Sequence, residues 1–211
     1  MAIDYPFFEP GFCPKQFQPG ADPQTLAVRS ILNQSIQTQG MPGKLWAFGM
    51  VLPATTDPAS RADVEAWFDG LNGQEVRVNI WHYGRRGGPL GNKRGYPMGT
   101  INTTGVQVNA NTAQFAQSVV LKGAGAGATL ARGDMFKIGN QLIMNPAVAT
   151  ANGSGLITVS ITGGLRAAAL ANAAVTLIRP TCQCVLADPK WRSSYEPGYS
   201  GEFGIDWIEA P

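Results

Sequence analysis

The sequence predicts a mainly β fold: a β-sandwich-like host domain with one short helix, plus an inserted small β-barrel or sandwich module. Three observations lead to this prediction. Residues 44–83 contain two alternating apolar runs on either side of one helical pattern. Residues 100–178 contain six short alternating runs separated by glycine-rich turns. Residues 181–189 and 202–210 then return to aliphatic alternation, which indicates that the middle segment is inserted.

The central unit, residues 44–83, begins with the run KLWAFGMVLP, whose large residues alternate as in a buried strand that stops at Pro53. Asp57 followed by Pro58 predicts a helix N-cap and first helical position, and Gly73 offers a left-handed stop. We therefore expect a helix over about residues 57–71, lying across a sheet. Four apolar residues recur at helical spacing in it: Val64, Trp67, Phe68 and Leu71. The next run, EVRVNIWHY, alternates as a second strand.

The segment before this unit contributes an arm and a strand. Residues 1–23 are rich in aromatic residues, so this arm must dock on the protein rather than remain in water. Residues 25–39 alternate throughout, which predicts one long strand that pairs with the run of residues 44–53 through the turn GMPG.

Two domains follow from this pattern. Residues 1–99 and 179–211 form the host β domain, and residues 100–178 form the inserted module. The two insertion points, near Thr100 and Arg179, should then lie close together.

Charge is distributed unevenly along the chain. Residues 76–187 contain ten basic residues and one acid, a net charge of +9, whereas the two ends contain six basic residues and thirteen acids, a net charge of −7. Opposite charges of this kind suit head-to-tail contact between identical copies. They are equally consistent with pairing inside one subunit. Charged residues make up only 14% of the chain, which favours a surface that partners cover.

The loop Gly84–Gly99 carries the densest positive charge and is the first candidate interface. Its basic residues are Arg85, Arg86, Lys93 and Arg94. A phosphate-binding loop is disfavoured because the sequence lacks the GKS or GKT ending before a helix, and four charges alone give weak, salt-sensitive nucleic-acid binding. The run GAGAGA likewise leads into another strand, so we expect a hairpin connection there rather than a dinucleotide site.

No active site is evident in the sequence, so we expect a protein that is not an enzyme and uses no cofactor or metal. His82 is the only histidine and lies in a predicted strand. Cys182 and Cys184 share one strand face, which suits buried free thiols better than a disulfide or a zinc site. Glu202 and Asp206 share a face that solvent should cover.

A second candidate surface is aromatic. It comprises Trp191, Tyr195 and Tyr199, expected near Trp81, and an aromatic-lined pocket of this kind would suit a binding module. No apolar run approaches the roughly 20 residues of a membrane span, and residues 1–12 lack the features of a signal peptide. We therefore expect a chain that stays in the cytosol where it is made.

With these residues in view, the chain resembles distal tail proteins, which lie at the tail tip of long-tailed, flexible bacteriophages. The resemblance rests on PATTDPASRADVEAWFDGLNGQEVRVNIWHY, the loop GRRGGPLGNKRGYPMGT, and the module segments AGAGATLARGD, FKIGNQLIMNPAVATANGSGLITVSITGGLR and AAVTLIRPT. It covers roughly residues 45–186, and these motifs are structural rather than catalytic.

The resemblance implies a structural role in the virion. Distal tail proteins form six-fold rings that join the tail tube to the tip or hub proteins, with a second domain facing outward, a place that residues 100–178 would take. The expected partners are other copies of the chain, the tail tube protein and the tip proteins, assembled in the host bacterial cytoplasm, with neither a membrane nor a specific nucleic-acid sequence involved. The alternative function is a tail-appended module that binds a receptor or glycan.

Overall fold

The computed structural model describes residues 2–22, 25–29, 36–40, 44–87, 93–192, 195–196 and 199–210; for residues 22, 25–28, 37–40, 86–87, 195–196 and 199–200 it describes the backbone alone. The described chain is mainly β with one helix, which confirms the predicted fold class, and none of its sheets closes into a barrel. The chain divides into two compact units, which we call unit 1 (residues 1–20, 46–84 and 181–211) and unit 2 (residues 21–45 and 85–180).

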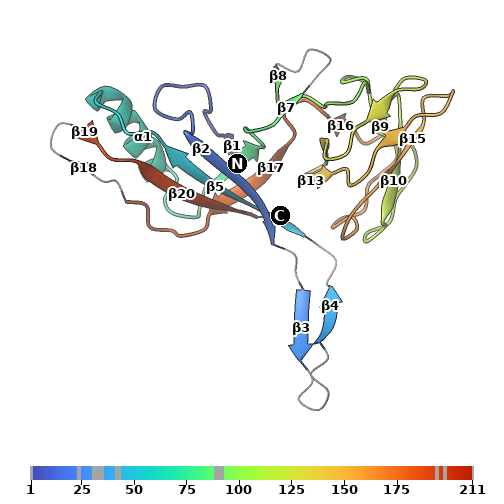
Figure 1. The fold of residues 1–211 in the computed structure, drawn as a ribbon, viewed down its shortest axis with the longest axis horizontal. Helices are drawn as coiled ribbons and strands as arrows, with labels where there is room; N and C mark the ends of the chain where they lie inside the picture. The colour runs from blue at the N-terminus through green and yellow to red at the C-terminus, as the bar shows by residue number, and fades with distance from the viewer. Residues whose placement is uncertain are drawn as a thin grey trace. The chain divides into compact units, whose positions relative to one another are not determined.

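Unit 1 is built on a six-stranded sheet in the order β1-β6-β17-β20-β5-β2 (Figure 1). The parallel pair is β1 with β6, while β6 with β17, β17 with β20, and β20 with β5 are antiparallel. These strands are β1 (Ala2–Asp4), β2 (Gln16–Asp22), β5 (Leu45–Leu52), β6 (Arg77–Trp81), β17 (Thr181–Leu186) and β20 (Phe203–Glu209). A short two-stranded sheet of β18 (Tyr195–Glu196) and β19 (Tyr199–Ser200) also belongs to unit 1.

One face of this sheet is apolar because its strands alternate in register. Every second residue of β5 is buried, and Phe48 and Met50 lie opposite Trp207 and Ile205 of β20. Helix α1 (Pro58–Gly70) covers this face, and the ring centroid of its Phe68 lies 5.1 Å from Phe203 and 6.1 Å from Trp207 (Figure 1). The predicted strand, helix and strand of the central unit are confirmed.

The helix begins as predicted and ends slightly earlier. The Asp57 carboxylate accepts hydrogen bonds from Ala59 N and Ser60 N, and hydrogen bonds from Ser60 and Ala59 hold the pKa of Asp57 below its usual value. Helical residues stop at Gly70, and the left-handed conformation starts at Asn72, with φ of 47°, before Gly73, with φ of 69°. Asparagine tolerates this conformation better than most residues, so the turn starts one residue before the predicted glycine.

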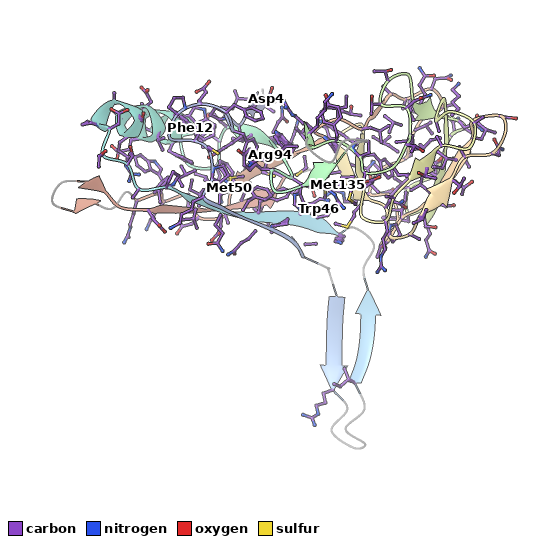
Figure 2. All side chains as sticks on the ribbon, turned by 45° about the horizontal axis from the view of Figure 1, so that its top comes forward. Asp4, Phe12, Trp46, Met50, Arg94 and Met135 are labelled. Atoms are coloured by element: carbon purple, nitrogen blue, oxygen red, sulfur yellow. The ribbon has the colours of Figure 1, made fainter. Side chains whose placement is uncertain are left out.

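The amino-terminal arm docks in unit 1, as its aromatic content predicts. Tyr5, Phe7 and Phe12 are buried, and the Tyr5 and Phe12 rings lie 5.4 and 5.6 Å from the ring of Trp67 on α1. Tyr5 Oη donates a hydrogen bond to the Phe12 carbonyl, and burial raises the pKa of Tyr5. Figure 2 shows Phe12 and Met50 in the layer between the helix and the sheet. The arm is therefore part of the core.

The prediction of one long strand over residues 25–39 is wrong. The segment forms two strands, β3 (Thr25–Arg29) and β4 (Ile36–Gly40), which pair with each other in an antiparallel hairpin with Arg29 opposite Ile36. The alternation of side chains is the same in one long strand as in two short ones, so it does not show where the chain reverses direction. The predicted turn GMPG includes residues 41–43, which lie outside the described residues.

Unit 2 also contains several small sheets: β15-β10-β9, β11-β14, β13-β12-β16 and β7-β8. Apolar side chains from these strands form one core, which includes Val119, Leu121, Leu130, Phe136, Ile157 and Val159. The predicted inserted module, residues 100–178, lies within unit 2, which further includes residues 21–45, 85–99 and 179–180. The strands are β7 (Arg86–Gly87), β8 (Lys93–Arg94), β9 (Gln107–Val108), β10 (Ser118–Lys122), β11 (Thr129–Leu130), β12 (Met135–Ile138), β13 (Gln141–Met144), β14 (Ala149–Thr150), β15 (Ile157–Ser160) and β16 (Val175–Thr176).

The segments that flank the predicted module meet at one backbone contact. The amide of Arg179 donates a hydrogen bond of 2.6 Å to the carbonyl of Gly95, which precedes Thr100 by five residues in the sequence. Within the described residues, no helix is long and apolar enough to cross a membrane.

Candidate functional site

The basic loop of the sequence is a β-hairpin in unit 2. Arg86 lies opposite Arg94, and Gly87 lies opposite Lys93, in the β7-β8 ladder. Two basic residues, Arg86 and Arg94, therefore form one cross-strand pair of this hairpin. Lys93 is exposed, with its ammonium 5.2 Å from the centre of the Tyr96 ring, and Arg94 is half-buried. The side chain of Arg86 lies outside the described part of the chain.

The structure places Arg85 differently from the other basic residues of this loop. It is half-buried, and its Nη2 lies 2.5 Å from the position that a Cβ on Gly133 would occupy. Burial lowers the pKa of Arg85, and the nearby Asp134 carboxylate opposes that shift. Arg85 thus has an acid inside its own unit, so it is poorly placed to pair with a neighbouring copy, and the candidate interface reduces to Arg86, Lys93 and Arg94.

Asp134 is a structural link that the sequence analysis did not identify. It is fully buried, and its two carboxylate oxygens accept hydrogen bonds from the backbone amides of Met98, Gly99 and Ala131 at 2.7, 3.0 and 2.8 Å. Buried Asn145 donates to the carbonyls of Leu130 and Ala131 in the same turn. The Gly-Asp pair at a turn was the available signal. This carboxylate ties residues 98–99 to the turn after β11.

The basic hairpin gives a direct test of the charge argument. Replacing Arg86, Lys93 and Arg94 together by serine is expected to weaken self-association and reduce its dependence on salt, because each exposed ion pair contributes about 0.2–1 kcal/mol and salt screens it. Sedimentation velocity over a salt series measures both effects. Arg132→Ser, which removes an exposed charge of the same unit, is the control. Unchanged association in the triple variant would exclude the hairpin as an interface.

Among the described aromatic candidates, Trp81 and Trp191 pack against different rings of unit 1. The rings nearest to Trp81 are Phe7, Tyr83 and Phe8, at 5.0, 5.4 and 6.2 Å, and Trp81 is buried. Trp191 instead packs on Phe68 and Phe203, at 6.3 and 6.1 Å. Tyr195 and Tyr199 belong to the two-stranded sheet of β18 and β19, and their side chains lie outside the described residues. Of the predicted group, Trp191 therefore packs with rings other than Trp81.

Trp191 lines an open cleft of about 390 Å³ in unit 1. The cleft forms where the chain leaves β17 and runs beside the first half of β20, and the backbone amide of Ala187 donates to the Asp206 carbonyl at 2.8 Å. Three of its lining residues carry charge, Asp188, Lys190 and Asp206, and all three are exposed. The cleft is lined by residues 186–188, 190–191 and 204–206.

Several other ionisable and thiol side chains of unit 1 contact neighbouring residues of the fold. The His82 ring lies 5.4 Å from the Phe17 ring, and Glu202 pairs with Lys15 at the surface. Cys182 and Cys184 are fully buried with their sulfur atoms 3.4 Å apart. Buried Glu209 accepts a hydrogen bond from the backbone amide of Trp46 at 2.9 Å. Within the described residues, no three or more His, Cys, Asp or Glu side chains gather as a metal site would require.

Comparison with models of known protein families gives no match for this chain, and comparison with curated protein sequences gives none either.

Proposed function

We propose that this chain is a structural component of a bacteriophage tail tip, in which copies assemble head to tail into a ring that joins the tail tube to the tip proteins. The tail tip as the proposed location comes from the resemblance of the sequence to distal tail proteins. The six-fold ring, the tube and hub partners and the place in the virion come from that resemblance. Two features of the molecule support self-assembly independently of it.

The hairpin of β3 and β4 is the observation that carries the proposal. Its strands pair with each other, and no other described strand joins this two-stranded sheet. A lone hairpin is marginally stable in water, because it buries little apolar surface. Ile36 is 65% exposed on it. A second copy that covers this hairpin would supply the missing burial, as expected of an assembly arm.

The two units also carry opposite net charge. Unit 1 has five basic residues and twelve acids, a net charge of −7, and unit 2 has eleven basic residues and two acids, a net charge of +9. One of the two acids of unit 2, Asp134, is buried. The surface of unit 2 is therefore strongly positive and that of unit 1 negative, which favours contact between unit 2 of one copy and unit 1 of the next.

Shortening the hairpin tests the proposal. Replacing residues 25–40 by a short Gly/Ser linker is expected to abolish assembly while both units keep their melting transitions, because the hairpin adds no strand to another described sheet. Sedimentation velocity measures the assembly, and calorimetry measures the transitions. A shortened chain that assembles like the parent would contradict the proposal.

A further inference from the structure

We propose that unit 2 binds nucleic acid through the phosphate groups of its backbone, without reading its sequence, at the hairpin of β7 and β8 and the segment that closes beside it. Five basic residues form this site, which we call the basic cluster: Arg85, Arg86, Lys93, Arg94 and Arg179. The inference goes beyond the proposed ring. The site shares the hairpin with the candidate interface, and its test does not require assembly.

The fold adds a fifth basic residue to the four of the loop, and it does so at Gly95. The Gly95 amide donates a hydrogen bond of 2.9 Å to the Arg85 carbonyl, and the Gly95 carbonyl accepts one of 2.6 Å from the Arg179 amide. Arg94 directly precedes Gly95 and lies opposite Arg86 in the β7-β8 ladder. Arg179 follows Gly95 by 84 positions in the sequence, so the folded chain alone brings it to the hairpin.

Solvent reaches the cluster on the hairpin and on the segment beside it. Lys93 and Arg179 are exposed, and Arg85 and Arg94 are half-buried. Arg86 enters the argument through its backbone position in the ladder. An extended ligand can therefore contact charge on both sides of Gly95.

The positive charge of this region is not balanced by acids along the same part of the chain. Residues 76–187 contain one acid, Asp134, which is fully buried and accepts hydrogen bonds from three backbone amides. Unit 2 as a whole has a net charge of +9. A surface of this kind attracts polyanions, and its binding to nucleic acid is driven by the release of counterions from the phosphates.

The arrangement of charge favours nucleic acid over an acidic protein. Four residues of the cluster are arginines, and a guanidinium group can form paired hydrogen bonds with either a phosphate or a carboxylate. A protein surface usually mixes both signs, as unit 1 does with five basic residues and twelve acids. A nucleic-acid strand instead carries a continuous row of negative charges, so it brings no basic group to the cluster.

Arg179 offers a variant that removes one charge and leaves the backbone conformation undisturbed. Its φ of 45° lies in the left-handed region, which glycine adopts more readily than other residues do. Arg179→Gly should therefore fold normally. Lys122→Gln is the matched control, because it also removes one positive charge of unit 2, but from β10, where the Lys122 ammonium bonds to Asn172 Oδ1.

The test measures fluorescence anisotropy of a labelled oligothymidylate of about 20 nucleotides, titrated with the full chain at about 25–200 mM salt. Each phosphate contact to a single strand contributes about −0.7 to the slope of log K against log salt, so the parent should give a slope of about −2 to −3.5. Arg179→Gly should make this slope shallower by about 0.7 and weaken binding about fivefold near 100 mM salt. Lys122→Gln should retain the parent slope.

Lys93→Ser is a second variant, at an exposed position of the hairpin, and should lower the slope by the same amount as Arg179→Gly. Melting curves check that each variant is folded, and Lys93→Ser decides the test if Arg179→Gly is not.

The proposal is wrong if the parent does not bind the oligonucleotide at the lowest salt concentration. It is also wrong if the folded cluster variants and Lys122→Gln weaken binding equally, since the position of the charge would then have no effect. Polyglutamate of equal length is the competing ligand. If it binds as tightly as the oligonucleotide and with the same dependence on Arg179 or Lys93, the cluster is a docking surface for acidic protein segments and the assignment to nucleic acid fails.

Discussion

Phe68→Ala is expected to lower the free energy of unfolding of unit 1 by about 3–5 kcal/mol, the usual cost of removing a large buried aromatic side chain. Phe68 is fully buried on α1, and its ring meets those of Trp67, Trp191, Phe203 and Trp207. Its removal would leave a cavity between the helix and β20 that these large rings cannot readily fill. Most domains are stable by only 5–15 kcal/mol, so unit 1 would become marginal.

Chemical denaturation followed by tryptophan fluorescence measures this loss. Trp67→Ala should also lower the free energy of unfolding, but by less, since Trp67 is only half-buried on the same helix. Asp69→Ala on the exposed side of α1 is the control and should change stability by less than about 0.5 kcal/mol. Equal midpoints for Phe68→Ala and the parent would show that the helix does not pack on the sheet as described.

Asp134→Ala is expected to destabilise unit 2 by about 3 kcal/mol or more. The substitution leaves the backbone amides of Met98, Gly99 and Ala131 without their carboxylate acceptor, and each buried donor left without a partner costs about 1–3 kcal/mol. It also removes the carboxylate that opposes the lowering of the pKa of half-buried Arg85. Asp134→Asn retains one acceptor oxygen, so it should lower the stability of unit 2 by less than Asp134→Ala does.

Hydrogen exchange gives a local measure of this effect. The amides of Met98 and Gly99 should exchange faster in Asp134→Ala than in the parent, whereas core amides of α1 in unit 1 should not change. Arg132→Ala, an exposed neighbour in the same turn, is the control. Unchanged protection at Met98 and Gly99 would mean that the carboxylate does not hold this segment.

The central strand and the helix were predictable because side chains repeat every two residues along a strand and about every 3.6 residues along a helix. Alternation at Trp46, Phe48 and Met50 and helical spacing at Val64 and Phe68 correspond to backbones with two distinct repeats, and both elements are present. The aromatic arm was predictable for a different reason, since exposed aromatic rings are costly in water. The hairpin of residues 25–40 was not, because alternation continues unchanged through a reversal of the chain.

The contacts between distant residues carried no signal in the sequence. Arg85 shares its loop with three other basic residues, yet the charge of Asp134, 49 positions later, acts on it because both residues lie in unit 2. The cleft likewise depends on the pairing of β17 with β20, which brings Asp188 and Trp191 beside Gly204 and Asp206. Trp191 was identified from its residue type alone, whereas its partners in the cleft follow only from the pairing of those two strands.

We propose that copies of this chain assemble into a closed ring through their oppositely charged units. Native mass spectrometry of the purified chain over a series of ammonium acetate concentrations tests it most directly. We expect one closed species, of six copies as the resemblance implies, which dissociates as ionic strength rises because screening weakens contacts between exposed charges. A chain that remains monomeric at every concentration of protein and salt would contradict the account.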